Sequence, residues 1–269
     1  MASSERGFTA IVLAAQRGGR LDPLADRAGV SHKCLVPIAG KPLLEHVLRA
    51  LTVVPGLSRI HISIEKEAVP AIRAVPGACG GLGIPVDYVP AATNLADSVY
   101  AAAHGVDEPM LITTADNVLL TPEAIEKVVA RMRDGAEVVV AMATREAVLA
   151  AHPDGQRRFY RFTDAQYSNC NLYGLSGDKA VRLAEAFRSG GQFAKNPKRV
   201  AEAFGLVNLL ILRFGLVSLE GAMRRLSRRF GVRAEAVVLG DGAHAIDVDN
   251  GRTYEVARLL LLRRAGQAH

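Results

Sequence analysis

The sequence predicts an α/β protein with a three-layer, doubly wound sheet that is mostly parallel but mixed, because strand-like and helix-like segments alternate. Apolar runs typical of buried strands lie at residues 9–14, 59–64, 86–89, 109–113 and 136–143. Helical patterns lie at residues 42–51, 66–74, 94–103 and 122–133. In such an alternation the helices cover both faces of the sheet. We find no repeats and no linker, and we expect one domain over residues 1–269.

Individual elements follow from local signals. The run at residues 136–143 is almost continuously apolar, as a central strand buried on both faces requires. The helix at residues 122–133 follows Thr121, a residue type that caps helix N-termini. Residues 77–85 are glycine-rich, and we expect a connector there because no helix start follows them. The region after residue 152 reads as two strands joined by a turn.

Composition favours a soluble enzyme in a reducing compartment. The chain has 269 residues, 49% hydrophobic and 22% charged, which is enough to bury a sizeable core. Cys34, Cys79 and Cys170 have no metal-like spacing and are predicted to be free thiols. The polar start MASSERG has no secretory pattern, and the longest apolar candidate, residues 203–212, is too short to span a bilayer. We expect a cytoplasmic protein.

The net charge of +6 suits a phosphorylated or nucleotide substrate, although it also suits an anionic surface. Only one short basic run is interleaved with aromatic residues, residues 157–162, and there is no zinc pattern. Nucleic-acid binding is therefore disfavoured. No transmembrane segment is expected, peripheral membrane contact stays open, and the sequence does not define the oligomeric state.

The first motif with chemical content runs from the first strand to the first helix. Residues 9–14 lead into a basic glycine-containing turn, residues 17–20, and a loop then brings Lys33 before the helix start at Gly40–Pro42. A loop of backbone N–H groups and cations after a parallel strand can wrap a polyphosphate. The alternative is an ordinary strand–loop–helix connection that binds nothing.

This layout resembles the nucleotidyltransferase superfamily typified by molybdenum-cofactor guanylyltransferase and by sugar- and polyol-phosphate nucleotidyltransferases. The residues that match its signature are Leu13, Ala14, Ala15, Gly18, Arg20, Lys33, Gly40, Pro42 and Leu43. The resemblance implies a Rossmann-like nucleotide-diphospho-sugar transferase fold. It also implies that Arg20 and Lys33 act catalytically on the phosphates of an NTP. The nucleotide-binding residues would be Leu13, Ala14, Ala15, Gln16, Gly18, Gly19, Arg20 and Lys33.

Gln16 departs from this signature, because the family has a glycine there. That glycine lets the backbone approach the nucleotide closely. Gln16 could offer its amide to the base or to a phosphate, or it could mark weakened nucleotide binding.

A second motif is LITTADNVLLTPE, residues 111–123. Asp116 lies just past the carboxyl end of an apolar strand, the edge where open α/β sheets bind ligands. A carboxylate there can hold Mg²⁺ against phosphate oxygens. The family carries an Asp at the same place, so Asp116 is predicted to be a metal ligand. Asp116 and Asn117 could instead form a simple turn.

A third motif, AIDVD at residues 245–249, precedes the last helix. Its alternation predicts a short strand with Asp247 and Asp249 on one face. Two carboxylates on one face repel each other unless a cation or hydrogen bonds compensate. The family resemblance implies that Asp249 completes the Mg²⁺ site and that Asp247 is a supporting or second-metal residue. The alternative is a helix cap and a surface residue.

Two further regions give weaker predictions. Asn94 and Ser98 lie one helical turn apart, and a comparable stretch lies beside the nucleotide in related enzymes; helix capping is the equal alternative. Arg158, Asn169 and Asn171 are tentative acceptor contacts, since arginine suits a phosphomonoester and asparagine suits hydroxyls. Residues 178–232 are read as a basic, helix-rich insertion.

Together with these motifs, the family resemblance implies transfer of a nucleoside monophosphate from an NTP, with CTP or GTP favoured, to a phosphorylated small molecule, with Mg²⁺ as cofactor and release of pyrophosphate. A non-catalytic nucleotide-binding regulatory protein is one alternative. A glycosyltransferase of related fold is another, although Asp116–Asn117 lacks the two acids flanking one residue that such enzymes show.

Overall fold

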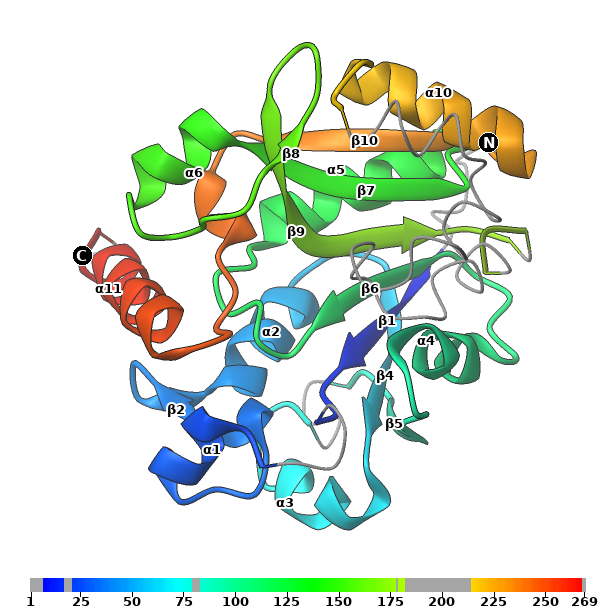
Figure 1. The fold of residues 1–269 in the computed structure, drawn as a ribbon. Helices are drawn as coiled ribbons and strands as arrows, with labels where there is room; N and C mark the ends of the chain where they lie inside the picture. The colour runs from blue at the N-terminus through cyan, green and yellow to red at the C-terminus, as the bar shows by residue number, and fades with distance from the viewer. Residues whose placement is uncertain (1–6, 17–20, 79–82, 178, 182–213, 268–269) are drawn as a thin grey trace.

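The computed structural model describes residues 7–16, 21–78, 83–177, 179–181 and 214–267. A single large sheet runs through the middle of the molecule in the order β10-β7-β9-β6-β1-β4-β5, and β8 pairs with β9 beside it (Figure 1). Its strands are β1 (Phe8–Leu13), β4 (Leu57–Ile64), β5 (Val86–Pro90), β6 (Met110–Thr114), β7 (Val138–Thr144), β8 (Tyr160–Arg161), β9 (Gln166–Leu175) and β10 (Ala234–Leu239). A small separate pair is formed by β2 (Pro37–Ile38) and β3 (Lys41–Pro42).

The sheet is mostly parallel and mixed, so the predicted fold class is confirmed. The central strand β1 runs parallel to β4 on one side and to β6 on the other. The strand β9 runs antiparallel to both β6 and β7, which makes the sheet mixed. Because β1, β4 and β6 are parallel neighbours, their carboxyl ends meet at one edge of the sheet.

Helices cover both faces of the sheet and give three layers. Alternate residues of β1 face opposite sides, so Ala10 and Val12 belong to one core cluster and Ile11 to another. The first cluster includes α2 (Leu43–Thr52), α3 (Val69–Arg73) and α5 (Pro122–Arg133); the second includes α4 (Leu95–Ala103) and α10 (Leu219–Phe230). In Figure 1, α2 and α5 lie behind the sheet and α4 lies in front of it.

Two of the four predicted helices, α4 and α5, begin at the capping residues that the sequence offers, Asn94 and Thr121. The Thr121 hydroxyl accepts a hydrogen bond from Ala124 N and begins α5 as expected. The helix predicted at residues 66–74 is a 3-10 turn, η2 (Lys66–Ala68), followed by the short α3. Two short helices, α1 (Pro23–Ala28) and α6 (Arg145–Ala151), and the edge strand β10 were not predicted. The predicted insertion at residues 178–232 lies largely outside the described residues, and α10 is its main described part.

The prediction of a strand at residues 245–249 is wrong. The segment begins with a 3-10 turn, η3 (Gly242–Ala245), and then runs irregularly to α11 (Gly251–Gln267). The N–H of Val248 donates to the carbonyl of Asp116, and the N–H of Asp249 donates to the carbonyl of Asp247, so neither joins a strand ladder. Alternation of apolar and acidic residues here reflects burial of Ile246 and Val248 against the core without strand pairing.

Among the residues that the structure describes, no helix combines the length and the apolar character needed to cross a bilayer.

Gly242 fixes the path of η3 against α6. A Cβ atom at Gly242 would lie 2.2 Å from Ala147 C and Val148 N, and both are backbone atoms. We expect Gly242→Ala to lower the free energy of unfolding by about 1–3 kcal/mol, the usual cost of overpacking. Urea unfolding measures it, with Gly240→Ala as the matched control, since nothing lies within 4 Å of a Cβ there. Equal losses in the two variants would contradict the prediction.

Candidate active site

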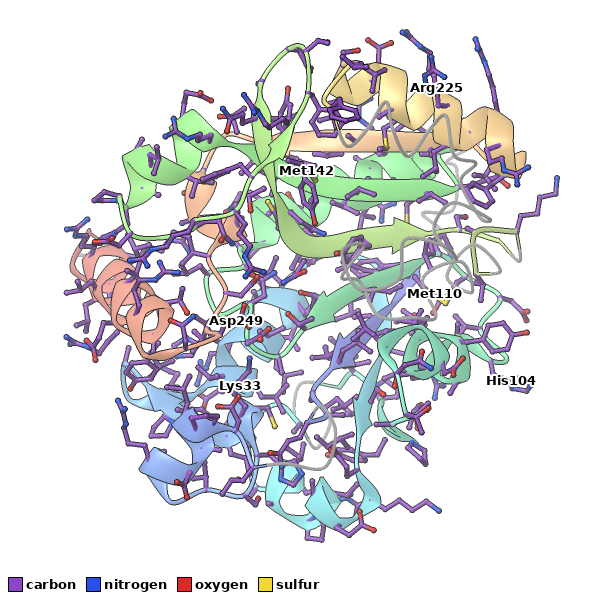
Figure 2. All side chains as sticks on the ribbon, viewed as in Figure 1. Lys33, His104, Met110, Met142, Arg225 and Asp249 are labelled. Atoms are coloured by element: carbon purple, nitrogen blue, oxygen red, sulfur yellow. The ribbon has the colours of Figure 1, made fainter. Side chains whose placement is uncertain are left out.

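The candidate active site lies at the carboxyl ends of β1, β4 and β6. Asp116 follows β6 directly, and Lys33 begins the 3-10 turn η1 (Lys33–Leu35). Asp249 lies just before α11, and the segment that carries it is joined to the β6 loop by the bond from Val248 N to Asp116 O, 3.1 Å long. Figure 2 shows Lys33 and Asp249 close together, although 216 positions separate them in the sequence.

Lys33 bridges two of the predicted metal ligands. Its Nζ donates to Asp116 Oδ2 at 2.5 Å and to Asp249 Oδ1 at 3.4 Å. The Asp116 side chain is 15% exposed and that of Asp249 is 70% exposed, so solvent screens the second contact more strongly. Burial lowers the pKa of Lys33, but the nearby carboxylates, Asp116 above all, outweigh burial and raise this pKa from its ordinary value. Lys33 is therefore charged at neutral pH.

Asp116, Asp247 and Asp249 form the acidic group of the site, and Asp247 is its buried member. Its Oδ2 accepts a hydrogen bond from Asn171 Nδ2 at 2.5 Å, whereas its Oδ1 is buried and has no hydrogen-bond partner. Burial, followed by the charges of Asp116 and Asp249, raises the pKa of Asp247 well above its ordinary value. A cation close to this carboxyl group would favour its ionised form.

Buried polar atoms without a hydrogen-bond partner gather at this edge of the sheet. In the described part of the chain they are Ser63 Oγ, Glu65 Oε2, Thr114 Oγ1, Asp116 Oδ1, Asn117 Oδ1, Asp247 Oδ1 and Arg252 Nη1. They come from the end of β4 and the residue after it, from the end of β6 and the loop after it, and from the segment that runs into the first turn of α11. Proteins usually satisfy buried polar groups, and a group left unsatisfied calls for an explanation such as an unseen ion or ligand.

The donor set fits a divalent cation that binds together with a phosphate. In the described residues, no group of three or more His, Cys, Asp or Glu side chains is placed to hold a metal ion by itself. Mg²⁺ commonly takes only one or two protein carboxylates and completes its shell with phosphate oxygens and water. Asp116 Oδ1 and Asp247 Oδ1 are buried oxygens without a partner, and oxygen is the ligand that Mg²⁺ requires.

Gln16 holds together the two ends of the segment between β1 and η1. Its Nε2 donates to the carbonyl of Ser31 at 2.8 Å, and its Oε1 accepts from the N–H of Asp22 at 3.2 Å. Its own backbone N–H donates to Glu65 Oε1 at 2.9 Å. The side-chain amide is therefore bonded to the protein itself, which differs from the expectation that it points at a ligand. Leu13, Ala14 and Ala15 lie at the end of β1, whereas Gly18, Gly19 and Arg20 lie outside the described residues.

The two side-chain bonds of Gln16 give a measurable expectation. Gln16→Gly removes both, and at about 0.5–1.5 kcal/mol each the free energy of unfolding falls by about 1–3 kcal/mol. Catalytic efficiency changes by less than roughly a hundredfold, because the lost amide is bonded to Ser31 and Asp22 and not to Lys33, Asp116 or Asp249. Gln16→Glu keeps the acceptor for Asp22 but replaces the donor to Ser31 with a carboxylate oxygen facing a carbonyl oxygen, so we expect it to cost at least as much as the loss of that one bond. A clear gain in NTP affinity with Gly would show instead that Gln16 obstructs the nucleotide.

Asn94 and Ser98 are used within the chain around the start of α4. Asn94 Oδ1 accepts from the N–H of Asp97 at 2.9 Å, which is helix capping. The Ser98 hydroxyl accepts from the N–H of Ala92 at 2.9 Å. The capping alternative therefore describes Asn94 in this structure, and nucleotide contact by either residue stays a prediction.

The three tentative acceptor residues are placed differently. Arg158 is exposed on the connection between α6 and β8, and its N–H donates to Gln156 Oε1. Asn169 and Asn171 lie on β9, and Asn169 Oδ1 accepts from the N–H of Asn171 at 2.8 Å. The structure thus connects Asn171 to the acidic group through Asp247, and no contact among the described residues connects Arg158 to it.

The sequence did not predict the roles of three side chains that shape the site, Glu65, His32 and Asn117. Glu65 receives the Gln16 N–H and lies 3.5 Å from the imidazole Nε2 of His32. Asn117 is fully buried, and its Nδ2 donates to Thr113 Oγ1 and to the carbonyl of Cys170, which ties the β6 loop to β9. A charged residue at the end of the apolar run 59–64 was the available signal for Glu65.

A family model described as the MobA-like NTP transferase domain matches residues 10–189 of this chain. The match covers more than half of the chain and includes Lys33 and Asp116. The chain therefore belongs to the family of MobA-like NTP transferase domains, a class of NTP-dependent transferases.

Individual relatives agree with this assignment. A solved structure described as a hypothetical transferase from Thermus thermophilus is 30% identical, with a TM-score of 0.72, and the match covers 93% of this chain and 99% of that one. The 4-diphosphocytidyl-2C-methyl-D-erythritol synthase of Anaerococcus prevotii is 14% identical, with a TM-score of 0.62 and coverage of 96% and 97%, which shows a shared fold.

Among curated proteins, the bifunctional protein GlmU of Azorhizobium caulinodans is 35% identical over 144 residues. This match covers 51% of the chain and 29% of that longer protein. The chain thus matches less than a third of the length of that protein.

Proposed function

We propose that this protein transfers a nucleoside monophosphate from an NTP to a phosphorylated small molecule and releases pyrophosphate. The observation that carries the proposal is the convergence of Lys33, Asp116 and Asp249, with partnerless buried oxygens around them, at the edge of the sheet where ligands bind. Family membership supports an NTP as the donor.

The chemistry needs little beyond positioning and charge neutralisation. An oxygen of the acceptor phosphate attacks the α-phosphorus of the NTP, the new P–O bond forms, and the bond to the bridging oxygen of the β-phosphate breaks as pyrophosphate leaves. Lys33 supplies a fixed positive charge beside the carboxylates, close enough to reach phosphate oxygens held there. A bound Mg²⁺, held by Asp116 and Asp249 with Asp247 beside them, would neutralise charge on the phosphates.

Two NTPs are favoured as donors. The name of the Anaerococcus prevotii relative contains a cytidyl group, which supports testing CTP first. The resemblance to molybdenum-cofactor guanylyltransferase supports GTP as the second. The acceptor is inferred to be a phosphomonoester, in keeping with the net charge of +6.

The test is pyrophosphate release from each of the four NTPs, with Mg²⁺ and a panel of sugar, polyol and pterin phosphomonoesters. We expect release only when an NTP and an acceptor are both present, and mass spectrometry should show the nucleoside diphosphate-linked product. Asp116→Asn serves as the inactive control.

Two results would contradict the proposal. Tight binding of a nucleotide without pyrophosphate release from any pair would favour a regulatory nucleotide-binding protein. Release of a nucleoside diphosphate from a nucleotide sugar would favour a glycosyltransferase.

A further inference from the structure

The strand β9 is irregular where it passes the candidate site. In its pairing with β7, Tyr173 lies opposite Val140 and Asn169 lies opposite Met142. One residue of β7 between these pairs therefore faces three residues of β9, and Asn171 is the middle one. Asn171 also has a φ of 45°, in the left-handed region that residues other than glycine adopt infrequently. Such bulges and strained residues are common beside active sites, where they redirect a side chain.

A chain of hydrogen bonds fixes the direction of the Asn171 amide. Asn169 Nδ2 donates to the hydroxyl oxygen of Tyr173, which is a short contact, and the Tyr173 O–H donates to Asn171 Oδ1 at 3.5 Å. Since Oδ1 of Asn171 is the acceptor from the tyrosine, its Nδ2 is directed to the other side. There Nδ2 donates to Asp247 Oδ2 at 2.5 Å.

The consequence falls on Asp247. The asparagine amide occupies Oδ2, which leaves the buried Oδ1 of Asp247 without a partner in the acidic group. Asp247 has no regular strand to hold it, because the segment at residues 246–250 is irregular. The orientation of its carboxylate therefore depends on this side-chain bond.

We propose that Asn171 is a positioning residue, which through the bulge of β9 holds Asp247 so that Asp247 Oδ1 faces a divalent cation. This proposal rests on the proposed function, since it assumes a cation at the acidic group. It also changes the expected role of Asn171 from acceptor contact to support of the metal site. Asn suits this position because it tolerates the left-handed conformation and carries a donor that a carboxylate cannot supply.

The test measures Mn²⁺ binding to the full chain by electron paramagnetic resonance of free Mn²⁺, first without nucleotide and then with a non-hydrolysable CTP or GTP analogue, the analogue alone serving as the blank. Asn171→Gly keeps the left-handed backbone and removes the donor. Loss of a residue that orients a metal ligand typically costs about 10- to 100-fold in metal affinity. We expect a loss in this range for Asn171→Gly and for Asp247→Asn, and no further loss when the two are combined. Circular dichroism confirms that each variant is folded.

A second variant keeps the test independent of the backbone. Tyr173→Phe removes the hydroxyl that orients the Asn171 amide, and we expect Mn²⁺ affinity to fall several-fold, by less than with Asn171→Gly. Asp134→Asn, at the end of α5, is the control and should bind Mn²⁺ like the wild type.

The outcomes separate the two proposals. If Asp116→Asn abolishes Mn²⁺ binding while Asn171→Gly and Tyr173→Phe leave it unchanged, the role of Asn171 is wrong and the proposed function stands. If the losses from Asn171→Gly and Asp247→Asn add fully in the double variant, Asn171 does not act through Asp247. If the wild type binds no Mn²⁺ either with or without the nucleotide, or if Asp116→Asn binds it equally well, both the cation site and the role of Asn171 are overturned.

Discussion

Asp116→Asn should lower the rate of nucleotidyl transfer by about a thousandfold, the upper range for loss of one group that stabilises charge in a transition state. Asp116 touches Lys33 at 2.5 Å and has a second oxygen that is buried and free of partners. The asparagine has nearly the same size but no charge, so it can neither balance Lys33 nor hold a cation as tightly. The measurement is steady-state pyrophosphate release at saturating Mg²⁺ with the NTP and acceptor pair that the pyrophosphate-release screen identifies.

The matched control for this prediction is Asp134→Asn. Asp134 follows α5 at the opposite edge of the sheet, and its side chain is 64% exposed. The same chemical change there should leave the rate within about twofold, as surface substitutions usually do. We expect a smaller loss from Asp249→Asn than from Asp116→Asn, because its carboxylate is largely solvated. A fully active Asp116→Asn would remove this residue from the site.

Local patterns were sufficient for most of the fold. The strands β1, β4 and β6 show apolar runs and the helices α2 and α5 show a helical apolar period. The capping residue of α5, Thr121, lies next to it in the sequence. Once the parallel order of β1, β4 and β6 is accepted, Asp116 must lie at the carboxyl edge with the residues after β1. This is why Lys33 and Asp116 could both be assigned to one site from the sequence, although their direct contact was not predicted.

The irregular parts depend on contacts that no local pattern contains. The acidic segment at residues 245–249 has the alternation of a strand, but its backbone bonds to the loop after β6, more than a hundred positions earlier. In the sequence, Gln16 stands where the family has a glycine, which suggested a contact with the ligand or weakened nucleotide binding. In the structure its side-chain amide joins Asp22 to Ser31. The left-handed Asn171 has no sequence signal, because the bulge is set by its pairing with both β6 and β7.

Lys33→Met should weaken NTP binding while leaving nucleoside binding almost unchanged, because the methionine keeps the length of the side chain and removes its charge. A hydrogen bond to a charged group contributes about 1.5–3 kcal/mol, which corresponds to roughly 10- to 150-fold in affinity. Isothermal titration with the triphosphate and with the nucleoside measures both values. Lys127→Met, on the exposed face of α5, is the control and should change neither affinity.

For Lys33→Met we expect metal affinity to change in the opposite direction from NTP affinity. In the structure the ammonium of Lys33 lies against Asp116 at 2.5 Å and Asp249 at 3.4 Å, so it competes with a cation for both carboxylates. Removing that positive charge should therefore tighten Mn²⁺ binding in the absence of nucleotide, even as it weakens NTP binding. If Lys33→Met lowered both affinities together, Lys33 would instead be a structural partner that holds the carboxylates in place. If it weakened nucleoside and triphosphate equally, Lys33 would not recognise phosphate at all.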